Sequence, residues 1–78
     1  MKEKFYLTYP PALVKQPIIY LLVKKFDLIP NIRGANVSEE MGLLAVELEG
    51  PQETIDSAVV WMRSQGVTVE PIEKNVIE

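Results

Sequence analysis

Residues 30–49, at the centre of the chain, read PNIRGANVSEEMGLLAVELE, which is the pattern of two strands joined by a turn. The proline opens an extended segment that ends near Val37, and Ser-Glu-Glu-Met-Gly then supplies residues that reverse the chain. After this turn, alternating apolar positions place Leu44, Val46 and Leu48 on one face. The stretch therefore predicts an antiparallel β-hairpin with one face turned toward a core.

Before the hairpin, the sequence predicts one strand and one helix. Residues 3–9 alternate with the period of a half-buried strand, which Pro10 ends. Pro17 suits the first position of a helix, because proline loses no intrahelical hydrogen bond there. Apolar residues then recur three and four positions apart, and they form a stripe made of Ile19, Leu22, Val23 and Phe26.

After the hairpin, the sequence predicts a second helix and a fourth strand. Pro51 again fits a first helical position, and Gly66 offers a left-handed cap at the other end. The apolar stripe of this helix is made of Ile55, Ala58, Val59 and Met62. A last strand begins at Val67, and Pro71 places it at a sheet edge because proline has no N–H for a ladder. Residues 74–78 are expected to form a frayed tail.

The predicted order is strand, helix, strand, strand, helix, strand, which is the ferredoxin-like α+β plan, βαββαβ. Two helices then cover one face of a four-stranded antiparallel sheet. We expect the 78 residues to form a single domain, with a core from about residue 4 to residue 72. The other face stays open, and Tyr6, Leu43 and Ala45 would lie on it with one side of residues 31–37. We expect this open face, or the unblocked edge of the second strand, to pair with a second copy.

Composition argues against several classes of function. Eight basic residues against eleven acidic ones give a formal charge of −3, so the basic excess that attracts nucleic acid is missing. The absence of histidine and cysteine removes the commonest general base, the commonest metal ligands and a thiol nucleophile. We therefore expect no enzyme, no metal and no cofactor. The longest apolar run, residues 18–23, is far shorter than the roughly 20 residues of a membrane span, so we expect a soluble, cytoplasmic protein without membrane insertion.

The candidate ligand site lies in the second predicted strand, at Asn31-Ile32-Arg33-Gly34-Ala35-Asn36-Val37. Side-chain amides stand there in an otherwise apolar run, and burying an amide costs free energy unless it finds a partner. The partner could be backbone, another subunit or a small ligand with amino and carboxylate groups. Another interpretation is local, in which Asn31 caps the strand start, Arg33 points to solvent and Asn36 begins the bend.

A series of short motifs along the chain resembles the NIL domain family. In order they are Tyr9-Pro10-Pro11, Pro17-Ile18-Ile19, Phe26-Asp27-Leu28, Asn31-Ile32, Ala35-Asn36-Val37, Leu48-Glu49-Gly50 and Ala58-Val59-Val60-Trp61-Met62. The resemblance covers about residues 4–72 and rests on the ordered series, since each motif is short. It implies a ferredoxin-like fold and a regulatory role. The family is known mainly as the C-terminal regulatory domain of the ATPase subunit of bacterial methionine importers, and it also occurs fused to iron–sulfur ferredoxin modules.

The resemblance also implies a ligand. Importer members of the family pair as dimers and bind methionine near the pairing surface, which inhibits transport. Asn31 matches the asparagine of the name-giving Asn-Ile-Leu motif and would bond the amino or carboxylate group of an amino acid. Val37 would contact a thioether, with Ile32 and Ala35 as weaker candidates. Arg33 stands where the motif has leucine, and it would either pair with a ligand carboxylate or point to water.

We therefore expect a small-molecule sensing or regulatory domain that forms a homodimer and binds methionine or a related amino acid. The competing expectation is a pure interaction module. Its sheet face would dock, without a ligand, on a transporter ATPase or on a redox enzyme of sulfur metabolism. Calorimetric titration with methionine, repeated after Asn31→Ala, separates these two expectations.

Overall fold

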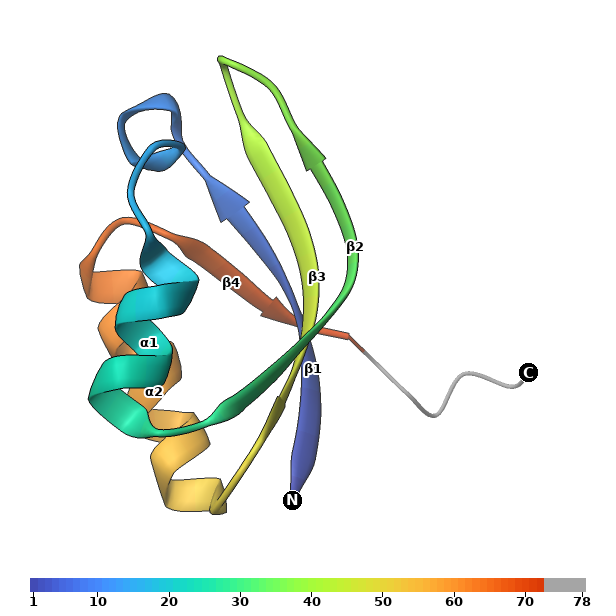
Figure 1. Cartoon of the computed structure of the whole chain (residues 1–78), viewed down its shortest axis with the longest axis vertical. Coiled ribbons are helices and arrows are strands. Elements are labelled where there is room, and N and C mark those ends of the chain that lie inside the picture. Colours follow the sequence, from blue (N-terminus) through green and yellow to red (C-terminus); the bar gives the residue numbers. More distant parts are fainter. Residues whose placement is uncertain (73–78) are drawn as a thin grey trace.

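The sheet has four strands in the order β2-β3-β1-β4, and each neighbouring pair is antiparallel, as predicted. The computed structural model describes residues 1–72 (Figure 1), so the tail predicted at residues 74–78 lies outside the described residues. Both β2 and β4 are edge strands, which confirms the edge position predicted from Pro71. The strands are β1 (Lys2–Tyr9), β2 (Ile29–Val37), β3 (Gly42–Glu49) and β4 (Thr68–Pro71).

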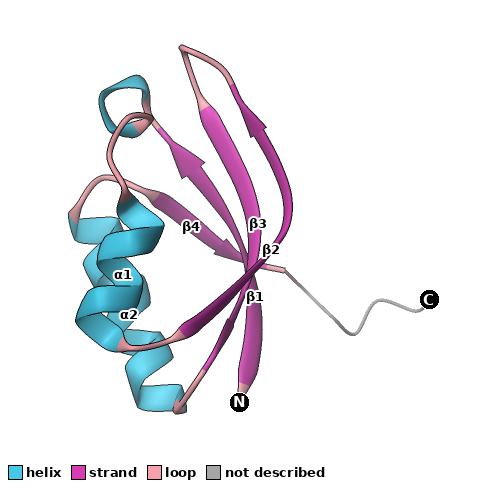
Figure 2. Ribbon diagram, in the orientation of Figure 1, coloured by secondary structure: helices cyan, strands magenta, loops and turns pink. Residues whose placement is uncertain are grey.

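Two helices, α1 (Ile18–Phe26) and α2 (Gln52–Ser64), lie side by side on one face of the sheet (Figure 2). Both begin one residue later than predicted, because Pro17 and Pro51 have non-helical backbone angles and stand at the N-cap instead. A short 3-10 helix that the sequence analysis did not predict, Pro11–Leu13, follows β1. None of the helices in residues 1–72 combines the length and the apolar composition of a membrane span.

Residues in the left-handed conformation end both helices. Gly66 has a φ of 104°, and its N–H donates to the Arg63 carbonyl, which confirms the predicted cap of α2. Asp27 follows α1 with a φ of 57°, and its N–H donates to the Val23 carbonyl at 2.7 Å. The chain therefore turns sharply from α1 into β2.

The core lies between the helices and the inner face of the sheet. Its buried side chains are Phe5, Leu7, Ile18, Leu22, Leu28, Val46, Leu48, Ile55, Ala58, Met62, Val67 and Val69. The stripe predicted for α2 supplies three of these residues. In α1, however, Ile18 is buried although the predicted stripe omitted it, while Ile19, Val23 and Phe26 are only half-buried. The first helix thus turns a slightly different side to the sheet than the spacing predicted.

Strand β2 lies outside this core. Every residue from Asn31 to Val37 is exposed, so the amides of Asn31 and Asn36 meet solvent in a single chain. The expectation that these amides lie inside a buried run is therefore wrong for the monomer. The reason is the edge position of β2, because the buried side chains come from the other three strands, the helices and the segments that follow the helices.

Candidate functional site

A β-bulge in β2 decides which way the side chains of this strand point. Ile32 pairs with Val46 and Gly34 pairs with Ala45, so Arg33 is an extra residue on β2. Because side chains alternate along a strand and paired residues share a face, one extra residue shifts the alternation for the rest of the strand. The residues before and after the bulge must therefore be assigned to faces separately.

The pairing divides the predicted ligand residues between the two faces of the sheet. Ile32 and Val37 pair with β3 positions that face the helices, whereas Asn31 pairs with Glu47 on the open face. The Asn31 side chain makes no hydrogen bond within residues 1–72. A single chain therefore does not bring Asn31 together with the apolar candidates.

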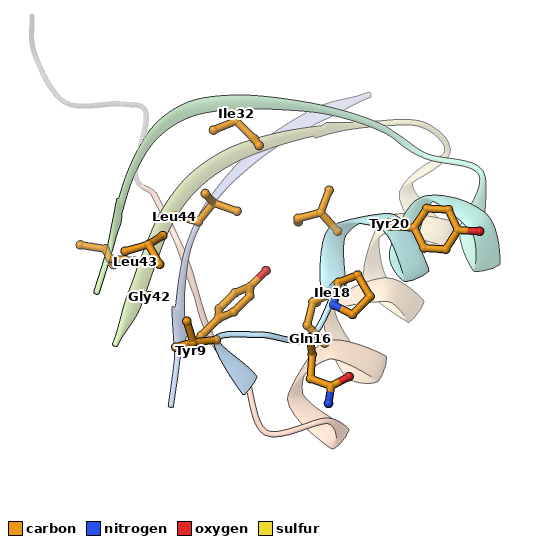
Figure 3. Close-up of a pocket in the computed structure, with 12 residues that line it drawn as sticks. Tyr9, Gln16, Ile18, Tyr20, Ile32, Gly42, Leu43 and Leu44 are labelled. Carbon is orange, nitrogen blue, oxygen red and sulfur yellow. The ribbon is translucent and has the colours of Figure 1, made fainter. Parts of the chain in front are cut away.

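A cavity of about 230 Å³ lies between the inner face of the sheet and the start of α1 (Figure 3). Ile32 and Val37 of the predicted site line it, whereas Asn31, Arg33 and Ala35 do not. The rest of the wall is also largely apolar, and it includes Ile18, Ile19 and Leu44. A cavity of this size and lining suits a small aliphatic or thioether group.

Tyr9 supplies the polar group that points into this cavity. Its hydroxyl is buried, and within residues 1–72 it has no hydrogen-bond partner. In Figure 3, the ring projects from the end of β1 toward α1 with its oxygen foremost, while the Gln16 amide and the Tyr20 hydroxyl point away. Burial raises the pKa of the Tyr9 phenol to about 12, because the phenolate would lose hydration.

Tyr9 was not among the predicted site residues, although the alternation of residues 3–9 places it on the same side of the strand as Phe5 and Leu7. The available signal was a hydroxyl-bearing aromatic residue at the last position of β1, on the same face as Phe5 and Leu7. In the ladder it lies opposite Gly42, where no side chain competes for space. That pairing depends on the sheet register, which the sequence alone did not supply.

The raised pKa of Tyr9 predicts a pH-dependent contribution to stability. The phenol has a pKa of 10.0 in the unfolded reference and about 12 in the folded chain, so the contribution is complete below pH 10 and is lost as the pH rises through 12. We expect the free energy of unfolding to fall more steeply over this range in the unsubstituted protein than in Tyr9→Phe. Urea denaturation at a series of pH values gives the free energy of unfolding of each protein as a function of pH. Because the ring is partly exposed, these two pH profiles should diverge by on the order of 1–2 kcal/mol. If the two pH profiles stay parallel, the Tyr9 phenol is hydrated in the folded protein.

The open face of the sheet carries an ion pair and exposed apolar side chains. Arg33 Nη1 lies 3.7 Å from Glu47 Oε1, so in a single chain the guanidinium has a protein partner in addition to its contact with water. Such an exposed pair adds little stability. Tyr6 and Leu43 are exposed on this face, as predicted, and with Ala45 they border a shallow depression of about 210 Å³.

The sequence matches a known family over most of its length. The NIL domain model matches residues 5–71, which reach from β1 to β4. "Methionine import ATP-binding protein MetN 1" of a Bacillus cereus strain is 30% identical over 59 residues, which cover 70% of this chain and 17% of that protein. The protein of the same name from Listeria innocua is 29% identical over 62 residues, which cover 74% of this chain and 18% of the relative. The chain thus spans less than a fifth of the length of these curated relatives.

A solved structure supports the fold independently. The C-terminal domain of an ABC transporter ATP-binding protein from Enterococcus faecalis superposes with a TM-score of 0.80 at 24% identity. The superposition covers 92% of this chain and 84% of that one, and it agrees with the ferredoxin-like arrangement described above. With the family match extending over all four strands and both helices, the chain belongs to the NIL domain family.

Proposed function

We propose that this domain is a regulatory module that binds methionine or a closely related amino acid beside a homodimer interface. The observation that carries the proposal is the apolar cavity next to the unpaired edge of β2. It occurs in a chain whose relatives are named methionine import ATP-binding proteins. In this proposal Ile32 and Val37 contact the apolar side chain of the ligand, while its charged amino and carboxylate groups stay at the open end. We further propose that the domain acts in the cytoplasm.

The free edge of β2 supports the dimer. The strand is nine residues long, has no proline after Pro30 and carries a single charge, on Arg33. Edge strands that stay unpaired are usually shortened or protected by lysine, proline or a covering segment. Ile32 and Val37 are 53% and 64% exposed, which is unusual for apolar side chains on the helix-facing side of a sheet. A second copy that adds its own β2 in antiparallel fashion would extend the sheet and cover these residues.

The polar contacts of the ligand are proposed from the NIL motif. Asn31 is our proposed partner for the amino or carboxylate group, and its exposed amide is accessible for that role. Since it lies on the open face near the start of β2, the polar end of the ligand would have to pass around the end of the strand, because its edge is paired in the proposed dimer. Arg33 would have to exchange Glu47 for a ligand carboxylate, and Ala35 would contribute only van der Waals contact.

Calorimetric titration with methionine tests the proposal. We expect binding heat with the unsubstituted protein and an affinity at least roughly tenfold lower in Ile32→Asp, because a carboxylate would then be placed in the apolar wall. Val60→Asp is the matched control, since Val60 is 66% exposed on α2 and does not line the cavity, and it should bind normally. Asn31→Ala tests the polar contact separately, and its affinity should also fall.

A pure interaction module is the second candidate. Tyr6 and Leu43 are 45% and 41% exposed on the open face, where they could dock on a transporter ATPase or on a redox enzyme of sulfur metabolism. If neither methionine nor homocysteine gives heat with the unsubstituted protein, this docking role replaces ligand binding.

A further inference from the structure

The Tyr9 hydroxyl is not explained by the packing of the fold. It is a buried polar atom without a hydrogen-bond partner in residues 1–72. Buried hydroxyls nearly always have a partner, because leaving one unsatisfied destabilises the folded state. Phenylalanine would place the same ring at the end of β1 without that penalty. The hydroxyl therefore calls for a partner that is not part of this chain's described residues.

The surroundings of the hydroxyl restrict what that partner can be. The oxygen points into the cavity of about 230 Å³, whose wall around it is apolar and includes Ile18, Ile19, Ile32 and Leu44 (Figure 3). The Gln16 amide and the Tyr20 hydroxyl are directed elsewhere. A group bound in this cavity contacts hydrocarbon on most sides and a single polar atom, the Tyr9 hydroxyl. It must be a mainly apolar group that carries a hydrogen-bonding atom.

We propose that Tyr9 determines ligand specificity by donating a hydrogen bond to an acceptor atom near the tip of an amino-acid side chain held in the cavity. This inference rests on the proposed function, because it requires that an amino acid enters the cavity. The phenol keeps its proton throughout the physiological pH range, since its pKa is raised to about 12, so it is always available as a donor.

The inference predicts an order of ligands that differ only in their acceptor. A thioether sulfur is a weak acceptor, a sulfoxide oxygen is a strong one, and the methylene of norleucine accepts no hydrogen bond. The unsubstituted protein should therefore bind methionine sulfoxide most tightly, methionine next and norleucine least. Cavity size and apolar contact alone would give methionine and norleucine nearly equal affinities and would disfavour the sulfoxide.

Calorimetric titration of the full chain with these three amino acids tests the inference. In Tyr9→Phe we expect the affinity for methionine sulfoxide to fall at least roughly tenfold and that for methionine by about threefold, while norleucine stays within about twofold. Tyr20→Phe is the matched control, because it removes a hydroxyl from the same wall that points away from the cavity, and the order of ligands should not change. Far-UV circular dichroism establishes that both variants are folded.

The outcomes distinguish this inference from the function on which it rests. If all three amino acids bind and Tyr9→Phe changes their affinities equally or not at all, the inference is wrong, while amino-acid binding stands. If Tyr9→Phe loses most affinity for methionine sulfoxide, less for methionine and least for norleucine, both amino-acid binding and the role of Tyr9 are supported. If the unsubstituted protein binds none of the three, the proposed function fails and the role of Tyr9 fails with it.

Discussion

Replacing Gly34 by lysine is expected to convert the proposed homodimer into monomers. Gly34 lies in the middle of β2, a Cβ atom built on it would meet nothing within 4 Å, and its φ lies outside the left-handed region. The single chain therefore accommodates a side chain at this position. If the isologous antiparallel pair is centred on the middle of β2, the two copies of residue 34 come close to the symmetry axis, where two ammonium groups repel each other. We expect the dissociation constant to rise by about a hundredfold or more, as measured by sedimentation velocity.

Gly34→Ala is the control for this experiment, because it adds a Cβ atom without a charge and should leave the dimer intact. Salt provides a second check. Since the repulsion is between exposed charges, raising the ionic strength should partly restore the dimer of the lysine variant. A lysine variant that dimerises as well as Gly34→Ala would rule out β2 pairing and would favour an interface that leaves position 34 free.

Leu22→Ala is expected to lower the free energy of unfolding by about 3–4 kcal/mol. Leu22 has no exposed surface and lies in the middle of α1, so its truncation leaves a cavity in the core. A chain of 78 residues has a total stability of roughly 4–12 kcal/mol, so this single change would remove a large part of it. Urea denaturation at one fixed protein concentration measures the loss, because a dimer adds concentration-dependent stability.

Leu43→Ala is the matched control, since the same chemical change occurs at a side chain that is 41% exposed on the open face. We expect a loss of about 1 kcal/mol or less there. Similar losses at positions 22 and 43 would contradict the location of the core between the helices and the inner face of the sheet.

The elements of the fold were predictable because their signals are local. Strand alternation, apolar stripes and the positions of Pro10, Pro71 and Gly66 mark where segments begin and end without knowledge of the rest of the chain. The helix starts were one residue early because proline is accepted both at the N-cap and at the first helical position, and only backbone angles separate the two. The side of α1 that faces the sheet was misjudged at Ile18, since burial there depends on how the sheet lies under the helix.

The candidate site was only partly predictable because it depends on strand register. Strict alternation along β2 places residues 31, 33, 35 and 37 on one face, and the predicted ligand set follows that pattern with Ile32 added. The bulge at Arg33 and Gly34 turns Val37 toward the cavity and leaves Asn31 on the open face. A glycine in a strand is a known sign of a bulge, but it does not specify which residue is left unpaired. The cavity and the orientation of Tyr9 need the positions of three strands and a helix.

The surplus residue in β2 also makes this strand unusually tolerant of shortening. In a regular ladder, losing one residue would send all later side chains to the opposite side of the sheet. Here the chain already contains one residue more than its partner strand, so removing Gly34 would let Arg33 take over the pairing with Ala45 while Val37 keeps its partner. Because a bulge bends the strand that carries it, the shortened strand would run straighter. Deleting Gly34 would thereby change the width of the entrance to the cavity that Tyr9 lines, without replacing any side chain on the cavity wall.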